Sequence, residues 1–152
     1  MKKNPKIIAS PLEGKVISLA EVPDPMFRDE LLGKGCAIIP ADGKLVSPFD
    51  GVIDSVPESR HAVMMTSEDG IELLIHIGID TVELKGEHFT SLVSVGERVR
   101  AGDVLIEFDV EAIKSAGYDI ATPIVVTNSE KYSSIKTLQK KVKSGADLIA
   151  LE

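Results

Sequence analysis

Three histidines could carry acid–base or group-transfer chemistry in this chain, and one of them, His76, stands in a strongly apolar run. That run, "IELLIHIGID", extends from residue 71 to residue 80. Successive side chains of a strand point to opposite faces, so Ile75 and Ile77 share the core face while His76 and Gly78 share the other. A glycine beside a titratable ring leaves the ring open to close approach by another molecule. The pattern therefore predicts an accessible His76, outside the main core.

A second imidazole, that of His61, is expected beside His76 on that face. The turn signal "SEDG" at residues 67–70 lies between the two runs that carry these histidines, which predicts a hairpin. A turn centred between Glu68 and Asp69 pairs His61 directly with His76. Directly opposed side chains of an antiparallel pair lie about 5 Å apart. The sequence thus predicts two adjacent imidazoles on one exposed face.

Two adjacent imidazoles suit three kinds of chemistry. They could bind a metal ion such as an adventitious zinc, although Asp80 and His88, the candidates for a third ligand, stand at no obvious ligand spacing. They could act as general acid and general base on a substrate. Alternatively, one neutral ring could attack phosphorus through its free nitrogen while the other donates a hydrogen bond to the phosphoryl oxygens. The residue types alone leave these three possibilities open.

The elements that must position these rings are mostly short strands. Glycine and proline recur at short intervals and separate β-rich runs, a pattern typical of an all-β, antiparallel sandwich or barrel. Two segments echo each other, "SPLEGKVISL" from Ser10 and "SPFDGVIDSV" from Ser47, which is compatible with two similar β-units sharing one core. The expected strands span residues 6–10, 15–19, 36–40, 44–48, 51–56, 62–67, 71–79, 104–109, 122–128 and 147–152.

Helical signals are few. Residues 24–33 begin with Asp24 as a candidate N-cap followed by proline and end at a glycine, and residues 109–117 repeat that logic. A third, amphipathic helix is expected within residues 129–145, because Leu138 and Val142 stand at i and i+4 and its lysines would form a solvated face.

Composition and charge restrict the class of protein. The 152 residues are 43% hydrophobic and 27% charged, which is ordinary for a globular protein, and this length suits one domain over residues 1–152. The net charge of −7 should repel nucleic acid and anionic membranes and suits a partner with a basic face. No apolar run is long enough for membrane insertion, and the start "MKKNPKIIASPLEG" has no apolar signal region. With a lone cysteine, Cys36, expected in the core, the chain is expected to be cytoplasmic.

A longer pattern around His76 resembles a known family. The run "LLIHIGIDTVELKGEHF", with "SRHA" upstream and "SVGERVRAGDVLIEFD" downstream, closely resembles the glucose-class enzyme IIA domain of the bacterial phosphoenolpyruvate-dependent sugar phosphotransferase system. The similarity extends from Ile7 to the C-terminus. It implies a duplicated β-sandwich that needs no cofactor and no metal. It also implies a phosphotransferase component with a phosphohistidine intermediate.

The resemblance also implies roles for single residues. His76 would accept the phosphoryl group on Nε2 from the phosphocarrier HPr and pass it to a cysteine on the IIB domain of a membrane sugar permease. His61 would stabilise the phosphoryl group, Ser59 would orient His61 in place of the threonine common in the family, and the Gly78 carbonyl would hold Nδ1 of His76. Where the family usually has "KGEGF" this chain has "KGEHF", so His88 has no family role and is expected at the surface.

The resemblance further implies a docking surface for both partners, made of acids at the rim and an apolar collar. Other proteins could also bind there in response to phosphorylation, although the chain begins almost at its first strand and the longer N-terminal tail of enteric members is not expected. The partner-binding residues would be Asp24, Met26, Phe27, Leu31, Leu32, Asp80 and Val82.

Three other interpretations compete with a phosphocarrier. "SPFDGVI" and "VGERVRAGDVLIEFD" are similar to strands of lipoyl and biotinyl carriers, but no hairpin presents the lysine such carriers need. A zinc peptidase of similar topology would need an H-x-H pair, and "HIG" is not that pair. A binding module that regulates other proteins through its phosphorylation state is compatible with the phosphocarrier interpretation.

Overall fold

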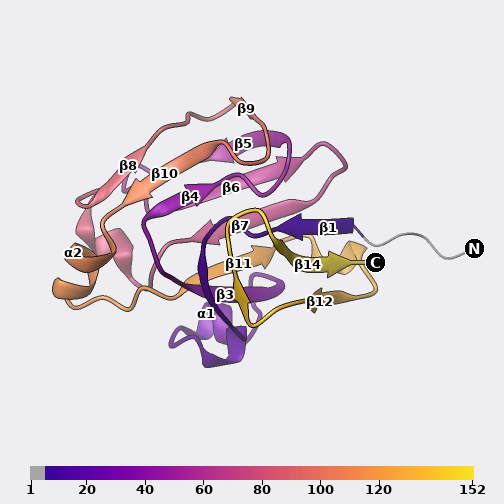
Figure 1. The fold of residues 1–152 in the computed structure, drawn as a ribbon, viewed down its shortest axis with the longest axis horizontal. Helices are drawn as coiled ribbons and strands as arrows, with labels where there is room; N and C mark the ends of the chain where they lie inside the picture. The colour runs from indigo at the N-terminus through magenta and orange to yellow at the C-terminus, as the bar shows by residue number, and fades with distance from the viewer. Residues whose placement is uncertain (1–5) are drawn as a thin grey trace, which may run out of the picture.

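The structure of the protein is a computed structural model that describes residues 6–152. It confirms an antiparallel β architecture with short helical segments (Figure 1). The helical segments are η1 (Leu19–Glu21), α1 (Pro25–Arg28), η2 (Thr81–Leu84), α2 (Val110–Ser115) and η3 (Ser129–Lys131). The strands are β1 (Lys6–Ala9), β2 (Gly14–Ile17), β3 (Lys34–Pro40), β4 (Lys44–Val46), β5 (Gly51–Ser55), β6 (Ala62–Ser67), β7 (Glu72–His76), β8 (Phe89–Ser91), β9 (Arg98–Val99), β10 (Val104–Phe108), β11 (Thr122–Val126), β12 (Ile135–Thr137), β13 (Lys141–Val142) and β14 (Asp147–Leu151).

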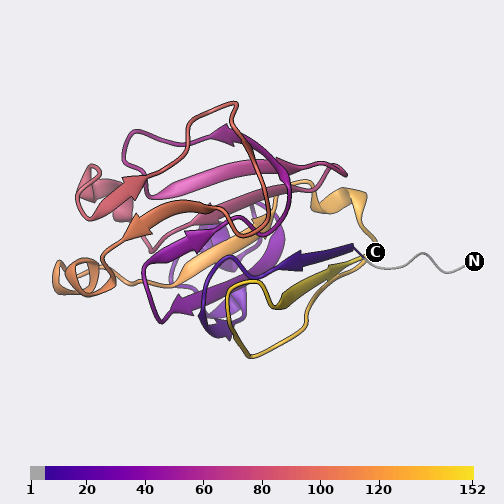
Figure 2. The same ribbon diagram turned by 45° about the horizontal axis from the view of Figure 1, so that its top comes forward.

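The strands form one large sheet and two small ones. The eight-stranded sheet has the order β13-β2-β3-β11-β7-β6-β5-β9, and the three-stranded sheets have the orders β1-β14-β12 and β4-β10-β8. In Figure 2 the small sheets lie over the long strands of the large one. The sandwich buries apolar side chains between the layers because each sheet has one apolar face.

The strand order reveals an internal duplication. One half contributes β13-β2-β3-β11 to the large sheet and the other contributes β7-β6-β5-β9, so that β11 and β7 meet at the centre. The Ser10 and Ser47 hydroxyls each donate to the carbonyl two residues ahead at 2.6 Å. The Ser10 N–H donates to the Ala146 carbonyl at 2.7 Å, as the Ser47 N–H donates to that of Asp103 at 2.8 Å. The sequence echo between the two Ser-Pro segments therefore marks two equivalent β-units.

The main core draws on both halves. Alternate residues of β7 and its flanks are buried as predicted, with Leu73, Ile75 and Ile77 at most 1% exposed. Ile79 belongs instead to a smaller cluster beneath η1 and α1, because the chain leaves the strand after His76. Cys36 is buried, and this burial raises the pKa of its thiol to about 12, as befits an unreactive core thiol.

Two of the three helix predictions are confirmed at their N-termini. The Asp24 carboxylate accepts the Met26 N–H at the start of α1, and the Asp109 carboxylate accepts the Ala112 N–H at the start of α2, both at 3.0 Å. Both helices are shorter than the patterns that predicted them.

The prediction of an amphipathic helix within residues 129–145 is wrong. This segment forms η3, β12 and β13, and β13 pairs with β2. Val142 is buried there between exposed neighbours, which is the alternation of a strand, whereas Leu138 is 44% exposed. An i, i+4 pair is a weak signal, and the hydrogen bonds offered by β2 and β14 outweigh it.

Candidate functional site

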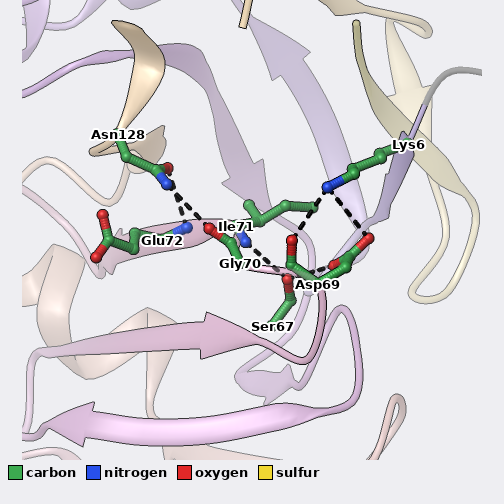
Figure 3. Close-up of polar contacts among 7 residues, drawn as sticks. All are labelled: Lys6, Ser67, Asp69, Gly70, Ile71, Glu72 and Asn128. Atoms are coloured by element: carbon green, nitrogen blue, oxygen red, sulfur yellow. Dashed lines mark hydrogen bonds and ion pairs between the residues drawn. The ribbon is translucent and has the colours of Figure 1, made fainter. Parts of the chain in front are cut away.

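A compact turn between β6 and β7 sets the register of the strand that carries His76. The Ser67 hydroxyl donates to the Asp69 carboxylate at 2.6 Å and accepts the Ile71 N–H at 2.8 Å (Figure 3). The buried Asn128 amide donates from Nδ2 to the Gly70 carbonyl at 2.9 Å and accepts the Glu72 N–H on Oδ1 at 3.1 Å. The Ser67 N–H donates to the Ile71 carbonyl at 2.9 Å, so the loop between them has three residues, and its last residue, Gly70, has a left-handed φ of +93°.

This turn shifts the predicted register by one residue. Ala62, and not His61, lies opposite His76. The two imidazoles are nevertheless adjacent, with ring centroids 4.8 Å apart and planes at 83°. His61 precedes β6, and Arg60 before it has φ +55°. The direction of the His61 side chain is therefore not set by the alternation of side chains along the strand. The adjacency was predicted correctly, but the pairing from which it was derived is wrong.

The His76 ring is held in one tautomer. Its Nδ1 lies 2.7 Å from the Gly78 carbonyl oxygen. A carbonyl only accepts, so Nδ1 carries the proton and Nε2 presents a free lone pair. Burial lowers the pKa of His76, and the hydrogen bond to Gly78 and the carboxylates of Asp24 and Asp80 oppose that shift only in part. His76 is thus a neutral imidazole at neutral pH.

The His61 ring is held from the opposite side by Ser59. The Ser59 Oγ lies 2.7 Å from Nδ1 of His61. His61 is only 7% exposed, so the prediction that both rings lie on an exposed face is wrong for this one. Burial, followed by the charge that His76 can carry, lowers the pKa of His61 to about 4. When the hydroxyl donates to Nδ1, the neutral His61 ring carries its proton on Nε2. The pair then offers one nitrogen acceptor and one N–H donor side by side.

The loop after His76 is locked by residues that sequence reasoning did not identify. Gly78 has φ +75°, and a Cβ added there would lie 2.6 Å from Thr81 Cγ2 and 3.0 Å from the Asp119 carbonyl. Thr81 is fully buried and donates from Oγ1 to the Ile77 carbonyl at 2.5 Å. The Asp119 carbonyl accepts the N–H of the residue after Gly78 at 2.9 Å. No local pattern signals Thr81 or Asp119, because their roles depend on contacts between segments.

Three of the five residues of the expected apolar collar are exposed. Met26 is 45% exposed, Leu31 65% and Val82 53%. Phe27 differs from the expectation of an exposed contact residue, because it is 4% exposed and its ring lies 5.1 Å from that of His76. Leu32 is half-buried against the same small cluster. Phe27 and Leu32 therefore support the collar from below.

The two expected rim acids occupy different positions. Asp24 is half-buried and caps α1, which places Phe27 against His76. Asp80 is exposed with φ +60° and makes no capping hydrogen bond. Both carboxylates favour a positive charge on the His76 ring. His88 is exposed, as predicted, with φ +74°.

A bare imidazole nitrogen beside an imidazole N–H is a suitable arrangement for accepting a phosphoryl group. The first nitrogen can attack phosphorus and the N–H can donate to the oxygens that gain charge. Comparison with known families bears on this chemistry. Residues 6–132 match the model of the phosphoenolpyruvate-dependent sugar phosphotransferase system EIIA 1 family.

The chain belongs to the EIIA 1 family. It is 48% identical over 128 residues, 84% of its length, to the β-glucoside-specific EIIBCA component of Bacillus subtilis, and spans about a fifth (21%) of that relative. It is 45% identical over 90% of its length to the glucose-specific EIIA component of Bacillus cereus, of which it covers 82%. The glucose permease IIA of Mycoplasma capricolum superimposes with a TM-score of 0.92 at 31% identity, covering 99% of this chain and 97% of the other.

The family assignment agrees with the fold, and it leaves the lipoyl carrier and zinc peptidase interpretations without support. As an EIIA domain the chain is a component of the sugar phosphotransferase system. Within residues 6–152, none of the helices has the length and apolar character needed to cross a membrane.

Proposed function

We propose that this EIIA domain is a cytoplasmic phosphocarrier in which Nε2 of His76 accepts a phosphoryl group from phospho-HPr and passes it to a cysteine of a IIB domain. The observation that carries the proposal is the hydrogen bond from Nδ1 of His76 to the Gly78 carbonyl at 2.7 Å, which leaves Nε2 as the nucleophile. Burial keeps His76 neutral and therefore nucleophilic at neutral pH.

In the first transfer the Nε2 lone pair forms a bond to phosphorus while the bond between phosphorus and the donor breaks. Nδ1 keeps its proton, so the phosphorylated ring carries a positive charge. The Gly78 carbonyl and the carboxylates of Asp24 and Asp80 stabilise that charge. The N–H of His61, held by Ser59, donates to a phosphoryl oxygen.

In the second transfer the thiolate sulfur of the IIB cysteine attacks phosphorus, and the N–P bond breaks with its electron pair returning to Nε2 of His76. The transition state is loose and spreads charge over the equatorial oxygens, so positioned donors supply most of the catalysis. His61 is the nearest such donor.

The exposed collar of Met26, Leu31 and Val82 is proposed to contact both partners, and Asp24 and Asp80 to attract cations on them. Regulatory proteins could bind the same surface. The named relatives are specific for glucose and β-glucosides, so we propose a permease of that class as the acceptor system.

Radiolabel transfer tests the assignment of both histidines. The label passes from phosphoenolpyruvate through enzyme I and HPr to the protein and then to a IIB domain. His76→Gln should accept no label, because an amide nitrogen cannot hold the phosphoryl group. His61→Gln should still be labelled, but onward transfer should slow by about a hundredfold or somewhat less, since a replacement amide recovers only part of the lost donor.

His88→Gln is the matched control, because it removes an exposed imidazole outside the site. It should accept and transfer at the wild-type rate. Labelling of His76→Gln at the wild-type level would refute the nucleophile assignment. Onward transfer by His61→Gln at the wild-type rate would remove the supporting role and leave the carrier function standing.

A further inference from the structure

The lysines near the C-terminus are segregated from the acidic residues. Residues 131–146 contain five lysines and no aspartate or glutamate. The whole chain has 17 basic and 24 acidic residues, so the rest of the chain contains 12 basic and 24 acidic residues. A protein with a net charge of −7 thus has a locally basic segment near its C-terminus.

Strand pairing places three of these lysines, Lys140, Lys141 and Lys143, at or beside β13, the edge strand of the large sheet. Lys141 on β13 lies directly opposite Lys15 on β2, and Lys15 lies opposite Ile39 on β3. Like charges directly opposed across two strands are destabilising. Lys140 and Leu138 line the same hollow as Lys15. We call Lys15, Ile39, Leu138, Lys140, Lys141 and Lys143 the lysine face.

The lysines of this face form no ion pair among the described residues. None of its four ammonium groups lies within 4.0 Å of a carboxylate in residues 6–152. In the described part of the chain Glu21 is the single carboxylate that lines the hollow, where its Oε2 accepts the Ser18 N–H at 3.1 Å, so one acid stands against the four lysines of the face. Ile39 and Leu138 are 37% and 44% exposed, so large apolar side chains stand among the ammonium groups.

The internal duplication shows that the fold does not require lysines at this edge. The Val16 N–H donates to the Lys140 carbonyl at 2.8 Å, and the Ile53 N–H donates to that of Glu97 at 3.0 Å, so Glu97 is the equivalent of Lys140. The partner strand there carries Val52 where the lysine face carries Lys15.

The remaining lysines of β13 and its flank also have equivalents. Lys141 corresponds to Arg98 and Lys143 to Arg100. The two arginines line a hollow that also contains the acids Asp50 and Glu68. The edge near β9 is therefore balanced in charge, whereas the lysine face is not.

We propose that the lysine face binds the surface of an anionic lipid bilayer. Each lysine near such a surface is attracted by the anionic headgroups, and exposed apolar side chains between lysines can enter the headgroup region. The face has no aromatic side chain on which bases could stack, which disfavours single-stranded nucleic acid. The net charge of −7 predicts repulsion from membranes, and the lysine face is the local exception.

This proposal rests on the proposed function, because the acceptor IIB domain belongs to a membrane permease. Side chains lie on the same face of a sheet when their residues are paired across strands or stand two apart along one strand. By this rule Lys15 shares its sheet face with Ala37, Val125, Leu74 and His76. A domain held at a bilayer by the lysine face would therefore remain close to the permease whose cysteine receives the phosphoryl group.

Vesicle sedimentation tests the lysine face. Wild-type protein should sediment with vesicles of equal parts phosphatidylglycerol and phosphatidylethanolamine at low salt, and not with pure phosphatidylcholine vesicles. Removing one lysine should weaken partitioning about fivefold, so Lys141→Gln with Lys143→Gln should weaken it about 25-fold. The matched control, Arg98→Gln with Arg100→Gln, makes the same change in net charge at the equivalent edge and should change partitioning less than about threefold.

Several outcomes would overturn the proposal. Equal losses in the two double variants would assign binding to overall charge, and equal binding to phosphatidylcholine would assign it to apolar contact alone. Binding to polyglutamate or to RNA in preference to anionic vesicles would assign the face to another partner. Lysines also discourage edge-to-edge pairing of strands. If a lysine variant aggregated while its monomer still bound vesicles like wild type, the lysines would serve only to prevent such pairing, and the membrane proposal would be wrong.

Labelling through enzyme I and HPr in solution separates this proposal from the proposed function. Lys141→Gln with Lys143→Gln should be labelled at the wild-type rate, because its changes lie outside the histidine site. Absence of label on wild type would overturn the phosphocarrier function. Normal labelling of wild-type protein that does not bind vesicles would overturn only the proposal that the lysine face binds a bilayer.

Discussion

The two imidazoles differ chemically because different atoms hold their Nδ1 nitrogens. A carbonyl holds that of His76 and a hydroxyl that of His61, both at 2.7 Å. The carbonyl of Gly78 can only accept, whereas the hydroxyl of Ser59 can donate. Two like rings thereby acquire complementary roles, one as an acceptor of phosphorus and the other as a donor to its oxygens.

The lowered pKa of His61 makes stability depend on pH. Its value is about 4 in the folded chain against an ordinary 6.5, so the unfolded chain binds more protons between these values. Stability should therefore be full above about pH 6.5 and fall as the pH drops towards 4. Between pH 7 and pH 5 we expect His61 to account for a loss of about 2 kcal/mol in the free energy of unfolding, measured with urea.

His61→Gln should remove that part of the pH dependence, while the smaller contribution of His76, in the same direction, remains. His88→Gln should keep the wild-type slope, since His88 is exposed. If His61→Gln lost as much stability as wild type between the two pH values, the protonation of a buried His61 would not be the cause.

Gly78 is the residue at which a single methyl group should disrupt the site. An alanine Cβ would meet Thr81 Cγ2 at 2.6 Å at a φ of +75°. The strain should move the carbonyl that holds His76, and losing such a support typically lowers activity about 10- to 100-fold. We expect Gly78→Ala to slow labelling by HPr to that extent, and nitrogen NMR to show a loss of the single His76 tautomer.

Gly70→Ala is the matched control, because Gly70 also has positive φ but has open space around its Cβ position. It should cost about 1 kcal/mol in stability and leave labelling per folded molecule unchanged. Equal effects of the two alanines on labelling would show that backbone strain in general, and not the position of the Gly78 carbonyl, controls the site.

At the scale of elements, the β6–β7 turn decides where His76 stands. A slip of one residue would move every side chain of β7 to the opposite face. The network around Ser67 and Asn128 favours the three-residue loop, because it pairs the N–H groups of Ile71 and Glu72 only in that register (Figure 3).

Asn128→Ala should weaken this hairpin. The substitution removes the two hydrogen bonds that Asn128 makes to the Gly70 carbonyl and the Glu72 N–H, which at about 0.5 to 1.5 kcal/mol each should cost about 1 to 3 kcal/mol in the free energy of unfolding. Faster amide exchange should be concentrated in β6 and β7. Lys6→Ala removes the exposed contacts to Asp69 and a long cation–π contact with Tyr132, 5.9 Å from the ring centroid, and should cost about 1 kcal/mol or less. Equal costs would argue against a special role for Asn128.

At the scale of the whole molecule, the two β-units depend on each other. β11 and β7 pair at the centre of the large sheet, and the main core contains side chains from both units. We propose that residues 1–152 form a single domain, of which residues 1–5 lie outside the described part of the chain. The histidine site occurs once, at the end of β7, although the fold is duplicated.

This dependence predicts that neither unit folds alone. The full chain should unfold in one thermal transition, and a fragment of residues 44–108 should be unfolded, because it lacks β11 and half of the core. Amide dispersion in a proton–nitrogen NMR spectrum measures this directly. A well-dispersed fragment spectrum would show that the units are separate domains.

Local signals in the sequence were sufficient for much of this protein. The alternation of apolar residues determined which face of β7 is buried, and Asp24 and Asp109 marked the starts of α1 and α2. The run around His76 was sufficient to indicate the family. Such features depend on neighbours within a few residues, so the chain specifies them before any long-range contact forms.

Only the tertiary structure decided the features that depend on distant segments. Asn128 and Ser67 together select the loop that places Ala62 opposite His76. Phe27, which was expected to be an exposed contact residue, is buried because α1 packs its ring against that of His76. Pairing with β14 and β2 places residues 135–137 and 141–142 in strands, although an i, i+4 pattern favours a helix. Backbone hydrogen bonds and burial between distant segments exceed the small local preferences, and a linear pattern does not contain them.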